Sequence, residues 1–219
     1  MSNFVNDTFT GTNGTSILDH TGELGATWAP ILFYITDANL RTTNWKIQSN
    51  AVGVDSSGFS PAAKASGTPL GANVAVELDL NYADTAHTTT VTMIARLSAD
   101  ELTHYLLNID LANASSDVYL EWHYSGGHSS DSGHATTGLN LNGAHTVRWE
   151  IAGNDHTFKV DGTSVYTVTN TFIPASGKIG LQYLNSGANR IALIDRVTGT
   201  DLAASAFWTD FVKSAETVV

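Results

Sequence analysis

The chain has 219 residues, of which 42% are hydrophobic and only 14% are charged, and its formal net charge is −11. Ten lysines and arginines spread over this length argue against a nucleic-acid partner, because phosphate binding needs clustered positive charge. No apolar run approaches the roughly 20 residues that cross a bilayer, and the absence of cysteine excludes disulfides and thiolate metal sites.

Apolar and polar residues alternate along most of the chain, and the alternating segments end at clusters of Gly, Asn, Asp, Ser or Pro. This pattern is typical of antiparallel strands and their turns. The segments are NWKIQSNAVGV (44–54), NVAVELDLNY (73–82), TTTVTMIARLS (88–98), THYLLNIDLA (103–112), VYLEWHYS (118–125), HTVRWEIAG (145–153), HTFKVDGTSVYTVT (156–169), KIGLQYL (178–184) and RIALIDRVTG (190–199). We therefore expect an all-β domain over residues 1–200, with roughly ten to fourteen strands in two stacked antiparallel sheets.

Two hairpins are marked by their turn residues. Gly153, Asn154 and Asp155 separate two alternating runs, and Asp161 and Gly162 separate the next two. Asp-Gly suits a type I′ turn, in which both central residues have positive φ. Both connections are predicted to be tight turns.

Helical spacing occurs only at the end of the chain, in DLAASAFWTDFVKSAE (201–216). Apolar residues recur there every three to four positions, which predicts a short amphipathic helix or an ordered tail over residues 201–219. Phe207, Trp208, Phe211 and Val212 would form an apolar patch. Either the patch packs back on the sandwich, or it is a docking segment for a neighbouring subunit.

Four stretches carry a family resemblance. HTVRWEIAGNDHTFKVDGTSVY (145–166) and SGKIGLQYLNSGANRIALIDRVTGTDL (176–202) resemble the final strands of concanavalin A-like lectin/glucanase domains, a group that includes laminin G-like domains. DTFTGTNGTSILDHTGELGATW (7–28), followed by NWKIQSN (44–50), is similar to the start of such domains in bacteriophage virion proteins and bacterial surface proteins. The resemblance implies a jelly-roll sandwich of a concave and a convex sheet, with ligands in the concave groove or on the loops of one rim.

The stretch VELDLNY (76–82) places Glu77, Asp79 and Asn81 on one face of a strand. In laminarinase-like glycosidases of this fold, a Glu-x-Asp-x-Glu motif supplies the nucleophile and the acid/base. Asn81 stands where the acid/base would be, and an amide cannot donate the proton that glycoside cleavage needs. We interpret the three residues as the solvent side of a half-buried strand, with sugar binding as the alternative and glycosidase activity as the less favoured one.

Two further sets of residues are candidates for ligand contact. His128 and His134 lie in the Gly/Ser-rich segment EWHYSGGHSSDSGHATTG (121–138), which lacks a rigid zinc-ligand spacing and is interpreted as a polar recognition loop. Trp28 lies in the loop-like GATWAPILFY (25–34), where it would be free to stack on a sugar.

Asp195 is the one candidate metal ligand. Some members of the resembled fold bind a calcium ion partly through an Asp of the last strand, and Asp195 matches that Asp by position. The alternative is a surface ion pair with Arg196 or Arg190. No cofactor is otherwise required.

Three functions are compatible with these features. The favoured one is a non-enzymatic structural protein of a phage particle, a capsid decoration or tail component displayed on the virion surface after assembly in the host cytoplasm, because the start MSNFVNDTFTG lacks an export signal. Its partners would be a major capsid or tail protein and further copies of itself, with a trimer as the expected homo-oligomer. The alternatives are a carbohydrate-binding module or lectin, and a β-glucan glycosidase.

Overall fold

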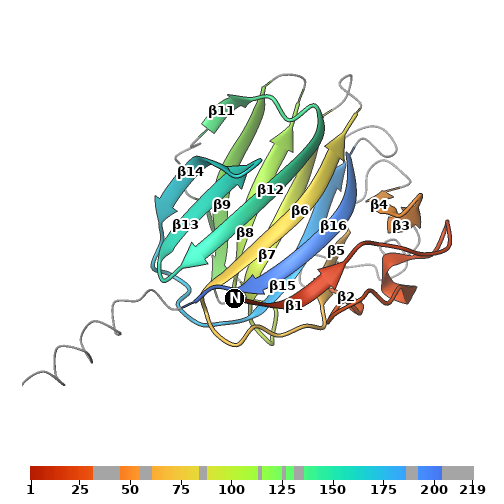
Figure 1. Cartoon of the computed structure of the whole chain (residues 1–219). Helices are drawn as coiled ribbons and strands as arrows, with labels where there is room; N and C mark the ends of the chain where they lie inside the picture. The colour runs from red at the N-terminus through yellow and green to blue at the C-terminus, as the bar shows by residue number, and fades with distance from the viewer. Residues whose placement is uncertain are drawn as a thin grey trace, which may run out of the picture.

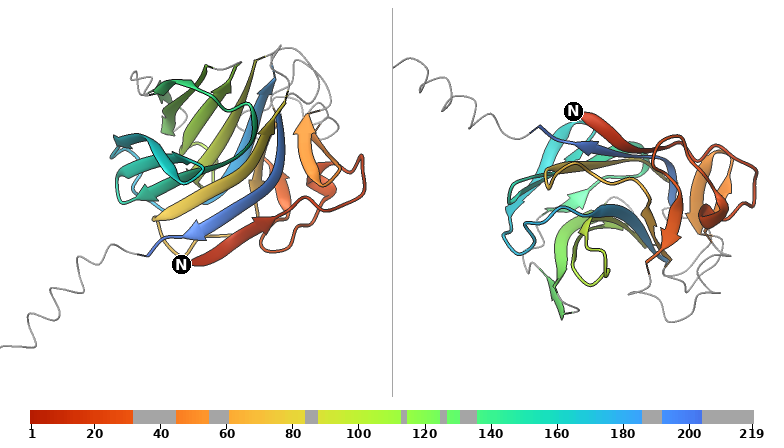
Figure 2. Two further views of the ribbon diagram at one scale, coloured as in Figure 1. Left: turned by 45° about the horizontal axis from the view of Figure 1, so that its top comes forward. Right: turned by 90° about the horizontal axis from the view of Figure 1, so that it is seen from below.

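The computed structural model describes residues 1–31, 45–54, 61–83, 88–112, 115–124, 127–130, 136–185 and 192–203. Over these ranges the chain forms two eight-stranded antiparallel sheets and one short 3-10 helix, η1 (Ile17–Asp19). Figure 1 shows the sheets as two layers, and Figure 2 shows the same layers from two further sides. The predicted all-β sandwich is confirmed.

Sheet 1 has the strand order β14-β13-β12-β6-β16-β4-β3, and β1 pairs with β16 outside this path. Its strands are β1 (Ser2–Asp7), β3 (Trp45–Gln48), β4 (Ala51–Val54), β6 (Val74–Tyr82), β12 (Gly143–Ala152), β13 (Asp155–Val160), β14 (Thr163–Thr169) and β16 (Ala192–Asp201).

Sheet 2 has the order β10-β9-β8-β7-β15-β5-β2, and β11 pairs with β9 outside this path. Its strands are β2 (Trp28–Pro30), β5 (Ala62–Ala65), β7 (Thr89–Leu97), β8 (His104–Leu111), β9 (Ser116–Tyr124), β10 (Gly127–Ser130), β11 (Thr136–Leu139) and β15 (Lys178–Asn185). Sequence periodicity did not identify β2, β5, β10 and β11, because three or four residues are too few to establish a period of two.

The core lies between the sheets and is built by the alternation itself. In β6 the side chains of Val76, Leu78 and Leu80 are buried while Glu77 and Asp79 are half-buried on the opposite face. A strand with one apolar face packs that face inward and leaves its polar face outward. The largest fully buried side chains include Trp45, Tyr82, Tyr105, Trp149 and Tyr183.

Both predicted hairpins are present. Gly153, with φ of 63°, and Asn154 connect β12 to β13. Asp161 and Gly162, with φ of 48° and 79°, connect β13 to β14. The second pair has the two positive φ values that a type I′ turn requires, which is why Asp-Gly is favoured there.

The first and last described strands lie side by side. β1 pairs antiparallel with β16, so the N-terminus lies next to the end of the last strand (Figure 1). Asp7, at the end of β1, is fully buried and accepts hydrogen bonds from Phe9 N at 2.7 Å, His20 Nε2 at 2.9 Å and Trp28 Nε1 at 2.7 Å. A buried carboxylate with several donors connects the opening segment to β2.

Arg96 is buried near the end of β7 and makes no ion pair within the described residues. Its guanidinium donates to the carbonyl oxygens of Ala72 at 3.0 Å, Gly153 at 2.6 Å and Ile173, which lie in three different connections between strands. It also lies over the ring of Tyr105, 5.9 Å from the ring centroid. The three nitrogens of one guanidinium therefore connect three inter-strand segments at one end of the sandwich.

The outer face of sheet 2 departs from simple alternation. Ile94, Leu97 and Leu106 point away from the core between the sheets, yet they are buried together with Ile31 and Ala62 in a second apolar cluster. β7 is accordingly buried on both faces along most of its length.

Within the ranges given above, no helix is long and apolar enough to cross a membrane. The expected C-terminal helix or tail, with Phe207, Trp208, Phe211 and Val212, lies outside the described residues.

Candidate functional site

The carboxylates of β6 are engaged by arginines from the two neighbouring strands. Arg196 donates to Asp79 at 2.7 Å and to Glu77 at 3.0 Å, and Arg148 donates to Glu77 at 3.1 Å. Thr146 adds a hydrogen bond to Asp79 at 2.9 Å. The hydrogen bond from Arg196 holds the pKa of Asp79 below its usual value, so this carboxyl stays ionised near neutral pH.

This ion-pair network supports the interpretation of Glu77 and Asp79 as the solvated side of a sheet. Asn81 is half-buried on the same strand, opposite Ala144 of β12 and Leu193 of β16. A general acid must hold a proton that it can release, and none of these three side chains is placed to do so. No acid/base pair is formed on this face by Glu77, Asp79 and Asn81.

Asp195 is the extra residue of a β-bulge in β16, where Ile194 pairs with Leu80 and Arg196 pairs with Asp79. Burial and the nearby Asp79 carboxylate raise the pKa of Asp195. Calcium takes six to eight oxygen ligands, many of them backbone carbonyl oxygens. Among the residues that the structure describes, no three His, Asp or Glu side chains are grouped to hold a metal ion, and Asp79 is bound by Arg196. The calcium ion that the resemblance implies stays a prediction.

The structure corrects the expected role of Trp28. Trp28 is only 3% exposed, lies in β2, packs on Phe9 and donates its indole N–H to Asp7. Its ring is therefore part of the core and cannot stack on a sugar. Trp28 begins a three-residue strand, which the loop-like sequence around it, with Gly25 and Pro30, did not predict.

The histidine candidates are placed only in part. The backbone of His128 lies in β10, opposite His123 of β9, and His134 lies outside the described residues. His123 stacks on His104 of β8, with ring centroids 4.8 Å apart. Burial and then the neighbouring His123 lower the pKa of His104 to about 4, so His104 is neutral at physiological pH.

A polar array that sequence reasoning did not identify lies on the outer face of sheet 2. Three cross-strand rows of β7, β8 and β9 build it: Thr90, Asp110 and Asp117; Thr92, Asn108 and Tyr119; Ile94, Leu106 and Glu121. We call its polar members the β8–β9 array. They are Thr90, Thr92, Asn108, Asp110, Asp117, Tyr119 and Glu121.

Hydrogen bonds across the strands hold this array in place. Thr92 donates to Asn108 Oδ1 at 2.6 Å, and Asn108 Nδ2 donates to Glu121 Oε2 at 2.8 Å. Thr92 and Asn108 are buried, whereas Glu121 is half-buried. A chain of buried hydrogen bonds thus orients a carboxylate that is partly open to solvent, which is how binding sites are preorganised.

Two carboxylates of the array are directly opposite each other on neighbouring strands. Asp110 of β8 pairs in register with Asp117 of β9 and accepts a hydrogen bond from Thr90 at 2.6 Å. One buried carboxylate oxygen of Asp117 has no hydrogen-bond partner among the described residues. Like charges in such positions destabilise a sheet, so this arrangement is not one that stability alone would favour.

Tyr119 lies in the same array. Burial raises its pKa to about 12, and the carboxylates of Asp110 and Glu121 add to the shift because they oppose a phenolate. The phenol therefore keeps its proton and remains a hydrogen-bond donor. An aromatic ring between carboxylates combines an apolar face with hydroxyl-binding groups.

The comparisons with known proteins agree with this fold. No family model and no curated protein matches the chain. Among solved structures, the carbohydrate-binding module CBM66 from Bacillus subtilis aligns over 80% of this chain and 92% of its own at 16% identity, with a TM-score of 0.54. A Bacillus licheniformis β-glucanase aligns over 90% and 98% at 15% identity, with a TM-score of 0.58. LamA from Z. galactanivorans, solved with laminaritriose and laminaritetraose, aligns over 90% and 98% at 11% identity, with a TM-score of 0.61.

These neighbours contradict the prediction that the protein is not an enzyme. Several of the similar structures are glycoside hydrolases, and the same fold also serves carbohydrate-binding modules. The prediction rested on Asn81 of β6, whereas Asp110, Asp117 and Glu121 lie in sheet 2 and were not considered. At these identities the likeness shows the fold alone, and the chain has the concanavalin A-like jelly-roll fold that glycan-binding and glycosidase domains share.

Proposed function

We propose that the protein binds a glycan on the outer face of sheet 2. The observation that carries the proposal is the hydrogen-bonded chain from Thr92 through Asn108 to Glu121, which orients a half-buried carboxylate beside Tyr119. Carboxylates accept hydrogen bonds from sugar hydroxyl groups, and aromatic side chains supply apolar contact.

The roles of the array follow from its protonation and burial. Tyr119 is a donor and Glu121 an acceptor; the buried Asn108, itself held by Thr92, donates to Oε2 of Glu121. Asp110 and Asp117 extend the acceptor surface along β8 and β9. A sugar that donates a hydroxyl to this pair would offset the repulsion between two opposed carboxylates.

The printed names of the neighbours support a carbohydrate ligand without naming it. CBM66 is a carbohydrate-binding module, and LamA was solved with two laminari-oligosaccharides. The proposed function is binding, and release of reducing ends tests whether a bound glycan is also cleaved.

Glu121→Gln is expected to weaken glycan binding about tenfold, since loss of one charged hydrogen bond costs on the order of 1.5 kcal/mol. The measurement is a screen of the wild-type protein against neutral and acidic oligosaccharides, followed by titration calorimetry with the ones that bind. Glu150→Gln is the matched control, because Glu150 lies on the outer face of sheet 1 and is held by Arg148 and Lys159. It should bind as the wild type does.

Equal loss in both variants would contradict the assignment of the site to sheet 2, and so would unchanged affinity in Glu121→Gln. Release of reducing ends from the bound oligosaccharide, measured on the same samples, asks whether binding leads to hydrolysis. Loss of that release in Asp110→Asn or Asp117→Asn with retained binding would assign the opposed carboxylates to cleavage.

The virion role remains a prediction from the sequence, and the structural neighbours reported above give it no support. Its basis is the start of the chain without an export signal, the absence of cysteine, the similarity of the N-terminal stretch to phage modules, and the apolar residues that follow β16. A particle component of this kind would assemble with a capsid or tail protein, and the expected trimer is measured by sedimentation. Neither partner nor copy number enters the glycan proposal.

Deletion of residues 207–219 tests the docking prediction. The shortened protein should remain folded, with a thermal midpoint within about 3 °C of the full chain, because 1 kcal/mol shifts the midpoint of such a chain by about 2–4 °C. Circular dichroism gives the midpoint, and sedimentation gives the copy number. A midpoint lower by more than about 6 °C would mean that this segment packs on its own sandwich, and an unchanged copy number would mean that it does not join subunits.

A further inference from the structure

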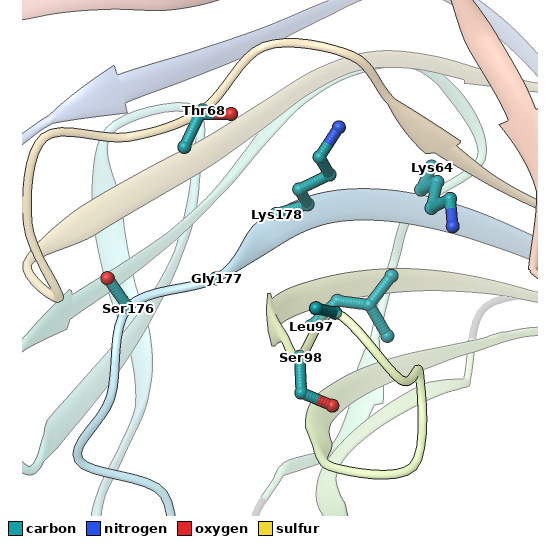
Figure 3. Close-up of a pocket in the computed structure, with 8 residues that line it drawn as sticks. Lys64, Thr68, Leu97, Ser98, Ser176, Gly177 and Lys178 are labelled. Atoms are coloured by element: carbon teal, nitrogen blue, oxygen red, sulfur yellow. The ribbon is translucent and has the colours of Figure 1, made fainter.

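A pocket of about 360 Å³ opens where β5, β15 and the turn after β7 meet. Figure 3 shows Lys64 and Lys178 on neighbouring strands, with Thr68, Ser98 and Ser176 around the same opening. Its size is in the range of small-molecule sites. Two lysines and several hydroxyl groups line this single cavity.

The pocket lies on the same face as the β8–β9 array. Ile179 points into the core, so Lys178 and Gln182 on the alternate positions of β15 point outward. Gln182 pairs with Thr92, which belongs to the array. Four residues of strand, about 13 Å, separate Lys178 from Gln182. Gln182 and Thr92 are themselves buried, so the pocket and the array share a sheet face but are separate sites on it.

Gly177 is required for this geometry. A Cβ atom at Gly177 would lie 2.5 Å from both Arg96 C and Leu97 O, so only glycine lets the start of β15 approach the end of β7 this closely. The contact places Lys178 opposite Leu97, next to the turn that begins at Ser98. The pocket is therefore part of the packing of the sheet.

The charges of the pocket are unevenly compensated. Lys64 is paired with the buried Glu101. Lys178 donates only to the carbonyl of Ser66 at 3.2 Å, and no carboxylate of the described residues lies within ion-pair distance of it. The ammonium of Lys178 thus lacks a nearby carboxylate, although the chain has a net charge of −11.

The hydroxyl groups add donors beside this ammonium. Thr68 and Ser176 are exposed and make no hydrogen bond within the described residues. Ser98 is committed, because it donates to Asp100 at 2.5 Å and accepts from Thr103 N at 3.0 Å. Two hydroxyl donors and one unpaired ammonium are thus available to a ligand that accepts hydrogen bonds and carries negative charge.

We infer that this pocket binds an anionic group of an acidic glycan, a sulfate ester or a carboxylate. The inference rests on the proposed glycan function and adds the charge class of the ligand. Lys178 neutralises the anion, Thr68 and Ser176 donate to its oxygens, and Lys64 is oriented by Glu101 at the rim.

The test compares a β-linked galactose tetrasaccharide in neutral, sulfated and uronate forms, with inorganic sulfate titrated in parallel. When the wild-type protein is titrated, calorimetry should show that a charged form binds at least tenfold more tightly than the neutral form. Lys178→Met should remove that advantage and leave neutral binding unchanged. Lys159→Met, a lysine paired with Glu150 on sheet 1, is the matched control and should keep the advantage.

Amide shifts of residues 176–178 upon sulfate addition report on the pocket without any sugar. Shifts that vanish in Lys178→Met, together with no binding of any tetrasaccharide, would support the anion site and overturn the glycan function. Binding of the neutral tetrasaccharide, with no tighter binding of either charged form, would support the glycan function and overturn the anion site. Tighter binding of the sulfated form than of the uronate identifies a sulfate ester as the ligand, and the opposite order identifies a carboxylate. A charged advantage that persists in Lys178→Met would overturn the assignment of the pocket.

Discussion

Arg96→Met is expected to lower the free energy of unfolding by about 3 kcal/mol or more, because it leaves three backbone carbonyls without their donors and each such loss costs about 1–3 kcal/mol. The carbonyls belong to Ala72, Gly153 and Ile173. Burial lowers the pKa of Arg96, but a guanidinium stays charged near neutrality. Urea unfolding, followed by the fluorescence of the buried tryptophans, measures the change.

Arg148→Met is the matched control for Arg96. Arg148 bridges Glu77 and Glu150 on the outer face of sheet 1, and after its removal Glu77 still has Arg196 and Glu150 still has Lys159. Arg148→Met should therefore lower the free energy of unfolding by less than about 1 kcal/mol. Arg96→Lys keeps the charge but has fewer directed donors. Its loss in the free energy of unfolding should lie between the losses of Arg96→Met and Arg148→Met. Equal costs for Arg96→Met and Arg148→Met would show that the three carbonyl contacts contribute little.

The second large effect is a loss of stability in acid caused by His156. This side chain is 1% exposed, and neither ring nitrogen makes a hydrogen bond within the described residues. It contacts Tyr105 edge-on at 4.6 Å and stacks near Trp149 at 5.7 Å. Burial, and then the charge of Arg96, lower the pKa of His156 to about 3.

The direction of the pH dependence follows from that pKa. In the unfolded chain a histidine takes up its proton near pH 6.5, whereas in the folded protein His156 does so near pH 3. The stabilisation is complete above pH 6.5 and is lost as the pH falls toward 3, at about 1.4 kcal/mol per pH unit. His104, with a pKa of about 4, adds a second loss of the same sign between pH 6.5 and 4.

Urea unfolding between pH 7 and 4.5 isolates the histidines, because the lowered pKa values of Asp79 and Glu150 affect stability mainly below about pH 4.5. His156→Phe retains an aromatic ring in the core and removes the titrating group. As the pH falls, the free energy of unfolding of this variant should decrease less steeply than that of the wild type. The difference between the two slopes should be about 1.4 kcal/mol per pH unit. An unchanged slope in His156→Phe would show that His156 does not control the acid response.

Local features of the sequence determined the elements. Alternation in segments of eight to ten residues predicted β6, β7, β8, β12 and β16, because a strand with one apolar face has only one way to bury it. Asp161 and Gly162 predicted their turn, because the required backbone angles are a property of those residues. These conclusions needed no knowledge of distant partners.

The candidate site was not predictable in the same way. Thr92, Asn108 and Glu121 come from three strands, and which residues meet depends on the register of their pairing. The same is true of Lys64 and Lys178, which are 114 positions apart in a chain of 219 residues and line one pocket. The polar face of β6 was visible in the sequence, but the arginines that occupy it are on β12 and β16.

The sequence by itself determined the fold class, the tight turns and the exclusion of thiol chemistry, since each depends on residue type or on neighbours along the chain. Only the tertiary structure decided that Trp28 is buried against Asp7, that Arg96 holds three connections, and that sheet 2 carries an oriented polar array. The physical reason is that burial and hydrogen-bond partners are set by pairing between distant segments. Alternation indicates that a strand has two faces, and packing decides what each face meets.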